Sequence, residues 1–175
     1  MRIRETTPED LAVLAVIVSE SNKDVALKFG LDAGNCPKHP SFCTADWVRA
    51  DVARGERYFV IEEQGRAIGC VAYERPRADT AYLNRLSVLP EHRRRGIGER
   101  LVRFIAELAQ REGVGRISIG VIGEHDDLQR WYRKLGFMDG DLKRFAHLPF
   151  TVRYMACAPA ACAPVQPQFL ASAPS

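Results

Sequence analysis

The chain has 175 residues, of which 46% are hydrophobic and 27% are charged, and its formal net charge is +3. This length fits one domain with a sizeable core, and no apolar stretch approaches the roughly 20 residues of a membrane span. The five cysteines are odd in number and irregularly spaced, which argues against a disulfide framework. With no signal region at the N-terminus, a cytoplasmic protein that does not bind membranes is expected.

The first half of the chain alternates between helical and β patterns. Thr7 followed by Pro8 is typical of a helix start, and a glycine between two β-runs favours a hairpin. The expected elements are a strand around Ile3, a helix from Thr7, an irregular loop over 28–44, a helix over 46–54, and strands over 57–63 and 67–74.

The second half repeats the alternation more strongly. Leu101, Val102, Ile105 and Leu108 recur at helical spacing, while Arg116–Ile122 alternates like a strand. The expected elements are a strand over 81–89, a helix over 97–112, a strand over 116–122, a helix around 128–135, and one or two final strands, of which 150–155 is assigned.

This order predicts an α/β fold, with helices packed on one mixed sheet, over a single domain of residues 1–155. Residues 156–175 differ in composition. They contain seven Ala, four Pro and no Asp, Glu, Lys or Arg, which predicts an Ala/Pro-rich tail outside the fold.

The most informative segment joins the strand over 81–89 to the helix over 97–112. The strand ends at Pro90, and Arg93–Gly98 (RRRGIG) follows directly before the helix. Unpaired N–H groups at a helix N-terminus attract anions, glycines allow close approach, and arginines add charge-assisted bonds to phosphate. The segment therefore predicts a pyrophosphate site. It is neither a P-loop nor a dinucleotide fingerprint, because Leu101 stands where the latter needs a third glycine.

Two motifs resemble those of the GNAT superfamily of N-acetyltransferases. Arg93–Gly98 resembles motif A, the pattern Gln/Arg-x-x-Gly-x-Gly/Ala after a strand ending Val-x-Pro, and Trp131–Phe137 (WYRKLGF) resembles motif B. The resemblance implies a mixed sheet with a splayed parallel strand pair, flanked by about four helices. It also implies transfer of an acetyl group from acetyl-CoA to a primary amine by direct attack in a ternary complex.

The resemblance further implies that acetyl-CoA inserts between the strands over 81–89 and 116–122. The backbone of Leu86 and Val88 would pair with the pantetheine arm, and amides from Arg94 to Glu99 would hold the pyrophosphate. The cofactor-binding residues so implied are Leu86, Val88, Arg93, Arg94, Arg95, Gly96, Ile97, Gly98, Glu99, His125 and Tyr132. No metal is implied.

For catalysis, the resemblance implies that Tyr132 protonates the departing CoA thiolate. Family members often carry Asn seven residues before this Tyr, where this chain has His125, and Glu four residues before the motif A valine, where it has Asn84. A base is still needed, because an alkyl amine is mostly protonated at pH 7. Glu74, at the end of a neighbouring strand, is the first candidate base, and His125 is the second.

The partners implied are acetyl-CoA and an amine acceptor, either a small molecule or a protein amine. A homodimer stays open. The loop over 35–47, which holds His39 and Phe42, is expected to shape the acceptor pocket, and an anchored surface loop is the alternative.

Three rival interpretations remain. Cys36, His39 and Cys43 could ligate zinc, but a fourth ligand is missing nearby. An acetyl-CoA sensor without catalytic activity is a second, since Asn84 replaces the usual glutamate. Nucleic-acid binding through Arg93–Arg95 is disfavoured, because no aromatic residues are interleaved with the arginines.

Overall fold

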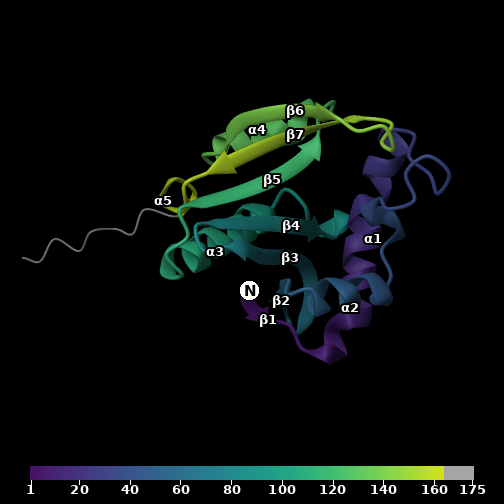
Figure 1. The fold of residues 1–175 in the computed structure, drawn as a ribbon. Helices are drawn as coiled ribbons and strands as arrows, with labels where there is room; N and C mark the ends of the chain where they lie inside the picture. The colour runs from purple at the N-terminus through teal and green to yellow at the C-terminus, as the bar shows by residue number, and fades with distance from the viewer. Residues whose placement is uncertain (164–175) are drawn as a thin grey trace, which may run out of the picture.

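A computed structural model describes residues 1–163, within which seven strands form one sheet in the order β1-β2-β3-β4-β5-β7-β6 (Figure 1). All neighbouring strands of this described sheet are antiparallel except β4 and β5. The strands are β1 (Arg2–Glu5), β2 (Arg57–Glu63), β3 (Arg66–Arg77), β4 (Thr80–Val88), β5 (Arg116–Ile122), β6 (Met138–Arg144) and β7 (Thr151–Cys157).

Five α-helices and three short 3-10 helices accompany the sheet within the same residues. They are η1 (Pro8–Asp10), α1 (Leu11–Lys28), η2 (Pro40–Phe42), α2 (Ala45–Ala53), η3 (Pro90–His92), α3 (Ile97–Arg111), α4 (Asp126–Lys134) and α5 (Pro159–Cys162). None of these helices is long and apolar enough to cross a membrane. The expected mixed α/β layout is confirmed.

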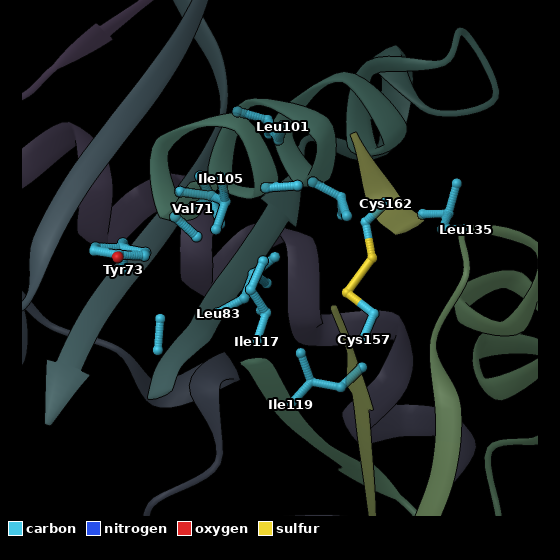
Figure 2. Packing of buried hydrophobic residues seen from close by; sticks show 14 of the residues in the cluster. Val71, Tyr73, Leu83, Leu101, Ile105, Ile117, Ile119, Leu135, Cys157 and Cys162 are labelled. Atoms are coloured by element: carbon cyan, nitrogen blue, oxygen red, sulfur yellow. A yellow bond between two sulfur atoms is a disulfide. The ribbon is translucent and has the colours of Figure 1, made fainter. Parts of the chain in front are cut away.

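Helices cover both faces of the sheet because the buried strands are apolar on both sides. In β2, Phe59 and Ile61 pack in the cluster that contains α3, whereas Tyr58 and Val60 pack in the cluster that contains α1. Successive side chains of a strand point to opposite faces, so both layers come from one continuous apolar run. Figure 2 shows the α3 side, where Leu101 and Ile105 of the helix approach Val71 and Leu83 of the sheet.

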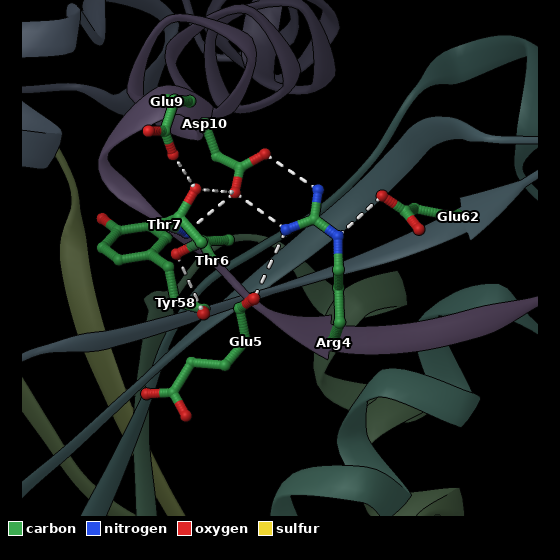
Figure 3. Close-up of polar contacts among 8 residues, drawn as sticks. All are labelled: Arg4, Glu5, Thr6, Thr7, Glu9, Asp10, Tyr58 and Glu62. Atoms are coloured by element: carbon green, nitrogen blue, oxygen red, sulfur yellow. Dashed lines mark hydrogen bonds and ion pairs between the residues drawn. The ribbon is translucent and has the colours of Figure 1, made fainter.

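The start of α1 is fixed by a polar network centred on Arg4 (Figure 3). The Asp10 carboxylate accepts the backbone N–H of Thr7 at 2.8 Å and two bonds from the Arg4 guanidinium, at 2.8 and 2.9 Å. Arg4 also donates to Glu62 of β2. The bonds from Arg4 hold the pKa of Asp10 at about 2, well below its usual value. This network ties the helix start to the sheet edge.

The C-terminal region differs from the sequence expectation. Strand β7 extends through Cys157, and α5 packs against α3, so the fold continues past residue 155; only 164–175 of the expected tail lie outside the described residues. Cys157 and Cys162 form a disulfide inside the larger core cluster (Figure 2). The cysteine count gives no sign of this bond, because the bond depends on α5, which lies in a segment expected to be a tail outside the fold.

Candidate acetyl-CoA and acceptor site

Strands β4 and β5 separate partway along their length. Their parallel ladder pairs Thr80–Tyr82 with Arg116–Ser118. The strands then continue to Val88 and Ile122 without further pairing to each other. The edge of β4 that faces β5 is thus left without ladder partners over its second half. Such an edge can accept an extended ligand as an added strand. The splayed pair implied by the family resemblance is present.

The Val88 N–H is directed to this open edge. Leu89 donates its N–H to Ile68 on the β3 side at 3.0 Å, and alternate N–H groups of a strand point to opposite sides. Val88 is in register with Gly69, and its carbonyl accepts a bond from Arg93 Nε at 3.1 Å. A backbone donor is therefore available where the two strands diverge.

A cavity of about 560 Å³ lies at the divergence. Its volume falls in the range of small-molecule sites, and it draws residues from both strands, from α1, η2 and α4, and from β7. The lining residues are Asn22, Val25, His39, Pro40, Tyr82, Leu83, Asn84, Arg85, Leu86, Ser118, Ile119, Gly120, Val121, Ile122, His125, Leu128, Tyr132, Phe150, Val152 and Tyr154.

The turn before α3 has the geometry of an anion site. Gly96 is the N-cap residue of α3 and adopts a left-handed conformation with φ of +74°, which a side chain would disfavour. Gly98 lies against the Trp131 indole, and a Cβ at this position would be 3.4 Å from the ring. The first N–H groups of α3 lack partners within the helix and sit at the positive end of its dipole.

The side chains around this turn are largely engaged with the protein itself. Arg93 donates to the Ser21 carbonyl and pairs with Asp24, both on α1, while Arg95 pairs with Glu63. Ile97 is buried in the core, Glu99 pairs with Arg103, and Arg94 is exposed with φ of +58°. The turn therefore offers backbone amides, and of its three arginines Arg94 makes no ion pair among the described residues.

Tyr132 lines the cavity from α4. Its ring makes edge contacts with Trp131 and Phe137, at centroid distances of 4.9 and 5.2 Å, which fix its orientation. Burial raises the pKa of Tyr132 above its usual value. The phenol is therefore protonated at neutral pH and can donate a proton.

His125, the N-cap residue of α4, also lines the cavity. Its ring packs on Phe29, and its Nδ1 atom is buried without a hydrogen-bond partner in the described residues. Burial, with a smaller effect of Lys28, lowers the pKa of His125, so the ring is neutral at pH 7. A buried polar atom without a partner is costly and points to a ligand or a water.

The other candidate base, Glu74, is not among the cavity residues. It stands opposite Tyr82 in the β3–β4 ladder, near Glu56, whose pKa is raised mainly by burial and further by Asp51 and Glu74. Glu56 is buried and accepts a bond at 3.4 Å from the amide of Asn84, a cavity residue. Sequence inspection missed Glu56, because a lone glutamate before a strand carries no pattern.

A β-bulge in β4 places two consecutive polar residues on one side. Arg85 has φ of +53°, and the β3–β4 register shifts at this point. Consecutive side chains of a regular strand would point to opposite faces. Here Asn84 contacts Glu56 and Arg85 pairs with Asp51 of α2, so both side chains lie on the side of α2. The bulge thereby brings a guanidinium into the cavity wall.

The loop over 35–47, expected to shape the acceptor pocket, contributes His39 and Pro40 to the cavity but not Phe42. Cys36 and Cys43 pack in different hydrophobic clusters. Within residues 1–163, no three His, Cys, Asp or Glu side chains converge as a metal site. The zinc interpretation therefore has no support in the geometry of this loop.

The family model of the acetyltransferase (GNAT) family matches residues 28–137. No curated protein sequence matches the chain significantly. Among solved structures, the ribosomal-protein-S18-alanine N-acetyltransferase from Escherichia coli is similar with a TM-score of 0.72 at 15% identity, over 95% of this chain and 97% of that one.

Two further similar structures contain the coenzyme. YncA from Salmonella typhimurium, with its cofactor acetyl-CoA, has a TM-score of 0.64 at 20% identity, over 90% of this chain and 93% of that one. The PaiA N-acetyltransferase from Thermoplasma acidophilum, in complex with coenzyme A, has a TM-score of 0.68 at 20% identity, over 90% of this chain and 98% of that one. Fold and family model agree: the chain is a member of the GNAT acetyltransferase family.

Proposed function

We propose that this protein is an N-acetyltransferase that transfers the acetyl group of acetyl-CoA to a primary amine by direct attack in a ternary complex. The observation that carries the proposal is the divergence of β4 and β5 around a cavity that Tyr132 lines. One opening can then hold a thioester and an amine together, which converts a bimolecular reaction into a reaction between bound groups.

Acetyl-CoA supplies the acetyl group as an activated thioester. The open backbone edge at Leu86 and Val88 would bind the pantetheine arm, and the Val88 N–H would donate to the thioester carbonyl. The amides from Arg94 to Glu99 would bind the pyrophosphate. His125 fits a pantetheine contact, because its buried Nδ1 lacks a protein partner. Two similar structures contain acetyl-CoA or CoA, which supports this assignment.

Two protons must move. As the C–N bond forms and the C–S bond breaks, Tyr132 would protonate the leaving sulfur and regain a proton, through water, from the nitrogen of the adduct. Before this attack, the acceptor ammonium must lose its extra proton to a base. No carboxylate of residues 1–163 lines the cavity. His125 is a neutral group in the cavity wall and would accept this proton directly or through water. Glu74 could take part only through water, because it lies outside the lining.

A sensor that binds acetyl-CoA without catalysis is the second candidate function. Asn84 stands where the resemblance places a glutamate, and this substitution is the observation that favours it. The two functions make different predictions about turnover. Both predict binding of acetyl-CoA, but only the enzyme predicts release of free CoA when an amine is added.

The test is to measure thermal unfolding with and without millimolar acetyl-CoA, and then CoA release with a panel of amines. A ligand that binds only the folded state must raise the unfolding temperature. A shift together with amine-dependent CoA release supports the enzyme. A shift without release from any amine favours the sensor, and the absence of a shift contradicts both.

A further inference from the structure

The charge pattern of the cavity restricts the acceptor. Among the lining residues in the described part of the chain, Arg85 is the one Arg or Lys, and no Asp or Glu is present. We propose, on the basis of the proposed function, that the acceptor is a small amine bearing a carboxylate close to the amine, as in a free α-amino acid, and that Arg85 and His39 bind this carboxylate.

Arg85 keeps most of its hydrogen-bonding capacity for a ligand. Its ion-pair partner among the described residues is Asp51, at 3.4 Å, and its guanidinium carbon lies over the Trp47 ring, 6.0 Å from the ring centroid. Asp51 also accepts bonds from the Tyr58 hydroxyl and from Arg54. Asp51 thus has two hydrogen-bond donors besides its ion pair with Arg85, while the Arg85 guanidinium has five N–H groups in a fork that matches a carboxylate.

His39 supplies a second donor. It is buried, and its Nδ1 accepts the backbone N–H of Ser41 and lies 2.8 Å from the Ser41 hydroxyl. Burial, with a smaller effect of Arg85, lowers its pKa, so the ring is neutral at pH 7. With Nδ1 occupied as an acceptor, the neutral ring carries its proton on Nε2, and this N–H is the donor left for a ligand.

The same pattern disfavours polyamines and other polycationic acceptors. Their additional ammonium groups would enter a cavity in which Arg85, itself positive, is the one charged side chain among the described lining residues. Asp51 and Glu56 lie behind the lining, are almost fully buried, and are already engaged with Tyr58 and Asn84. A buried ammonium without a carboxylate partner is strongly destabilised. A carboxylate near the amine, in contrast, places a negative charge against Arg85.

The experiment compares matched acceptors by CoA release from acetyl-CoA. Free L-amino acids, their C-terminal amides and the corresponding decarboxylated amines form the series, and spermidine is added as a polycation. The amide has the less basic amine, so chemistry without carboxylate recognition would favour the amide. We expect at least one free amino acid to exceed its amide and its decarboxylated amine at least tenfold in kcat/KM.

Variants then assign the preference to Arg85. Arg85→Gln should reduce the ratio of amino acid to amide at least tenfold by raising the acceptor KM, and Arg85→Lys should retain part of it. Arg54→Gln is the matched control, because Arg54 pairs with the same Asp51 from outside the cavity. This control should leave the ratio unchanged. Unfolding temperature and acetyl-CoA affinity verify that each variant folds.

The outcomes separate this proposal from the function on which it rests. Carboxylate recognition is overturned if kcat/KM for the amides, the decarboxylated amines or spermidine equals or exceeds that for every free amino acid. It is also overturned if the protein binds acetyl-CoA but turns over no amino acid. A preference that survives in folded Arg85→Gln overturns the role of Arg85. Failure to bind acetyl-CoA refutes the proposed function itself. If Arg85→Gln does not fold, the matched acceptors on the unmodified protein still decide the substrate class.

Discussion

Gly96→Asp, with Gly96→Asn as its matched control, isolates the effect of a negative charge at the proposed pyrophosphate site. Gly96 caps α3 with φ of +74°, and apart from its neighbours in the chain no described residue has an atom within 4 Å of where its Cβ would be. Either side chain therefore enters open space and imposes similar backbone strain, roughly 1–2 kcal/mol, less for Asn, which tolerates this conformation. For a chain of this size that strain lowers the unfolding temperature by about 2–8 °C.

The charge has opposite effects on the free and the bound protein. Without ligand, an aspartate at the N-cap interacts favourably with the helix dipole, so Gly96→Asp should be no less stable than Gly96→Asn. With acetyl-CoA bound, the same carboxylate would face the pyrophosphate. Two like unit charges about 4 Å apart near a surface repel each other by about 4 kcal/mol. A third of this repulsion is enough to lower the affinity for acetyl-CoA about tenfold.

The assay is titration calorimetry of acetyl-CoA into both variants at low and moderate salt. Gly96→Asp should bind at least tenfold more weakly than Gly96→Asn, and the gap should narrow as salt screens the repulsion. Equal affinities of the two variants at low salt would refute the idea that the α3 N-terminus binds the pyrophosphate.

Three further predictions address the rest of the molecule. Tyr132→Phe should lower kcat at least tenfold with nearly unchanged acetyl-CoA affinity; unchanged kcat would exclude Tyr132 as the acid. His39→Ala should raise the acceptor KM more than the acetyl-CoA KM, whereas Phe42→Ala, outside the cavity lining, should change neither. Asp10→Asn should destabilise the fold by on the order of 2 kcal/mol above pH 4. Urea unfolding should show this difference falling to a small fraction by pH 2, because the folded-state pKa of Asp10 is about 2 and half of the carboxylates are then protonated. A difference that is as large at pH 2 as at neutral pH would contradict the ion-pair origin.

The elements with strong periodicity could be predicted from the sequence. Helix α3 and strand β5 begin and end within a residue or two of the expected positions. Each has an apolar face that is buried in the core, and this face produces the periodicity seen in the sequence. The sequence pattern does not predict strand β6. All of its residues are exposed, and its Asp and Gly residues are unfavourable for a strand, so its pairing with β7 is what holds it in place.

The site could be predicted only where it is local in sequence. The turn at Gly96 and the position of Tyr132 followed from contiguous motifs. The Arg85 bulge and the buried Glu56 behind Asn84 depend on contacts between segments far apart in the chain. Composition and spacing carry no information on such contacts, which is also why the sequence favours Glu74 as a base although this residue lies outside the cavity lining.

A crystal structure of the protein with acetyl-CoA would test the central claim most directly. The account predicts the pantetheine arm between β4 and β5, alongside the backbone of Leu86 and Val88, and the pyrophosphate within hydrogen-bonding distance of amides from Arg94 to Glu99. The thioester should lie within reach of Tyr132. Acetyl-CoA bound at any other surface, or not bound at millimolar concentration, would contradict the account.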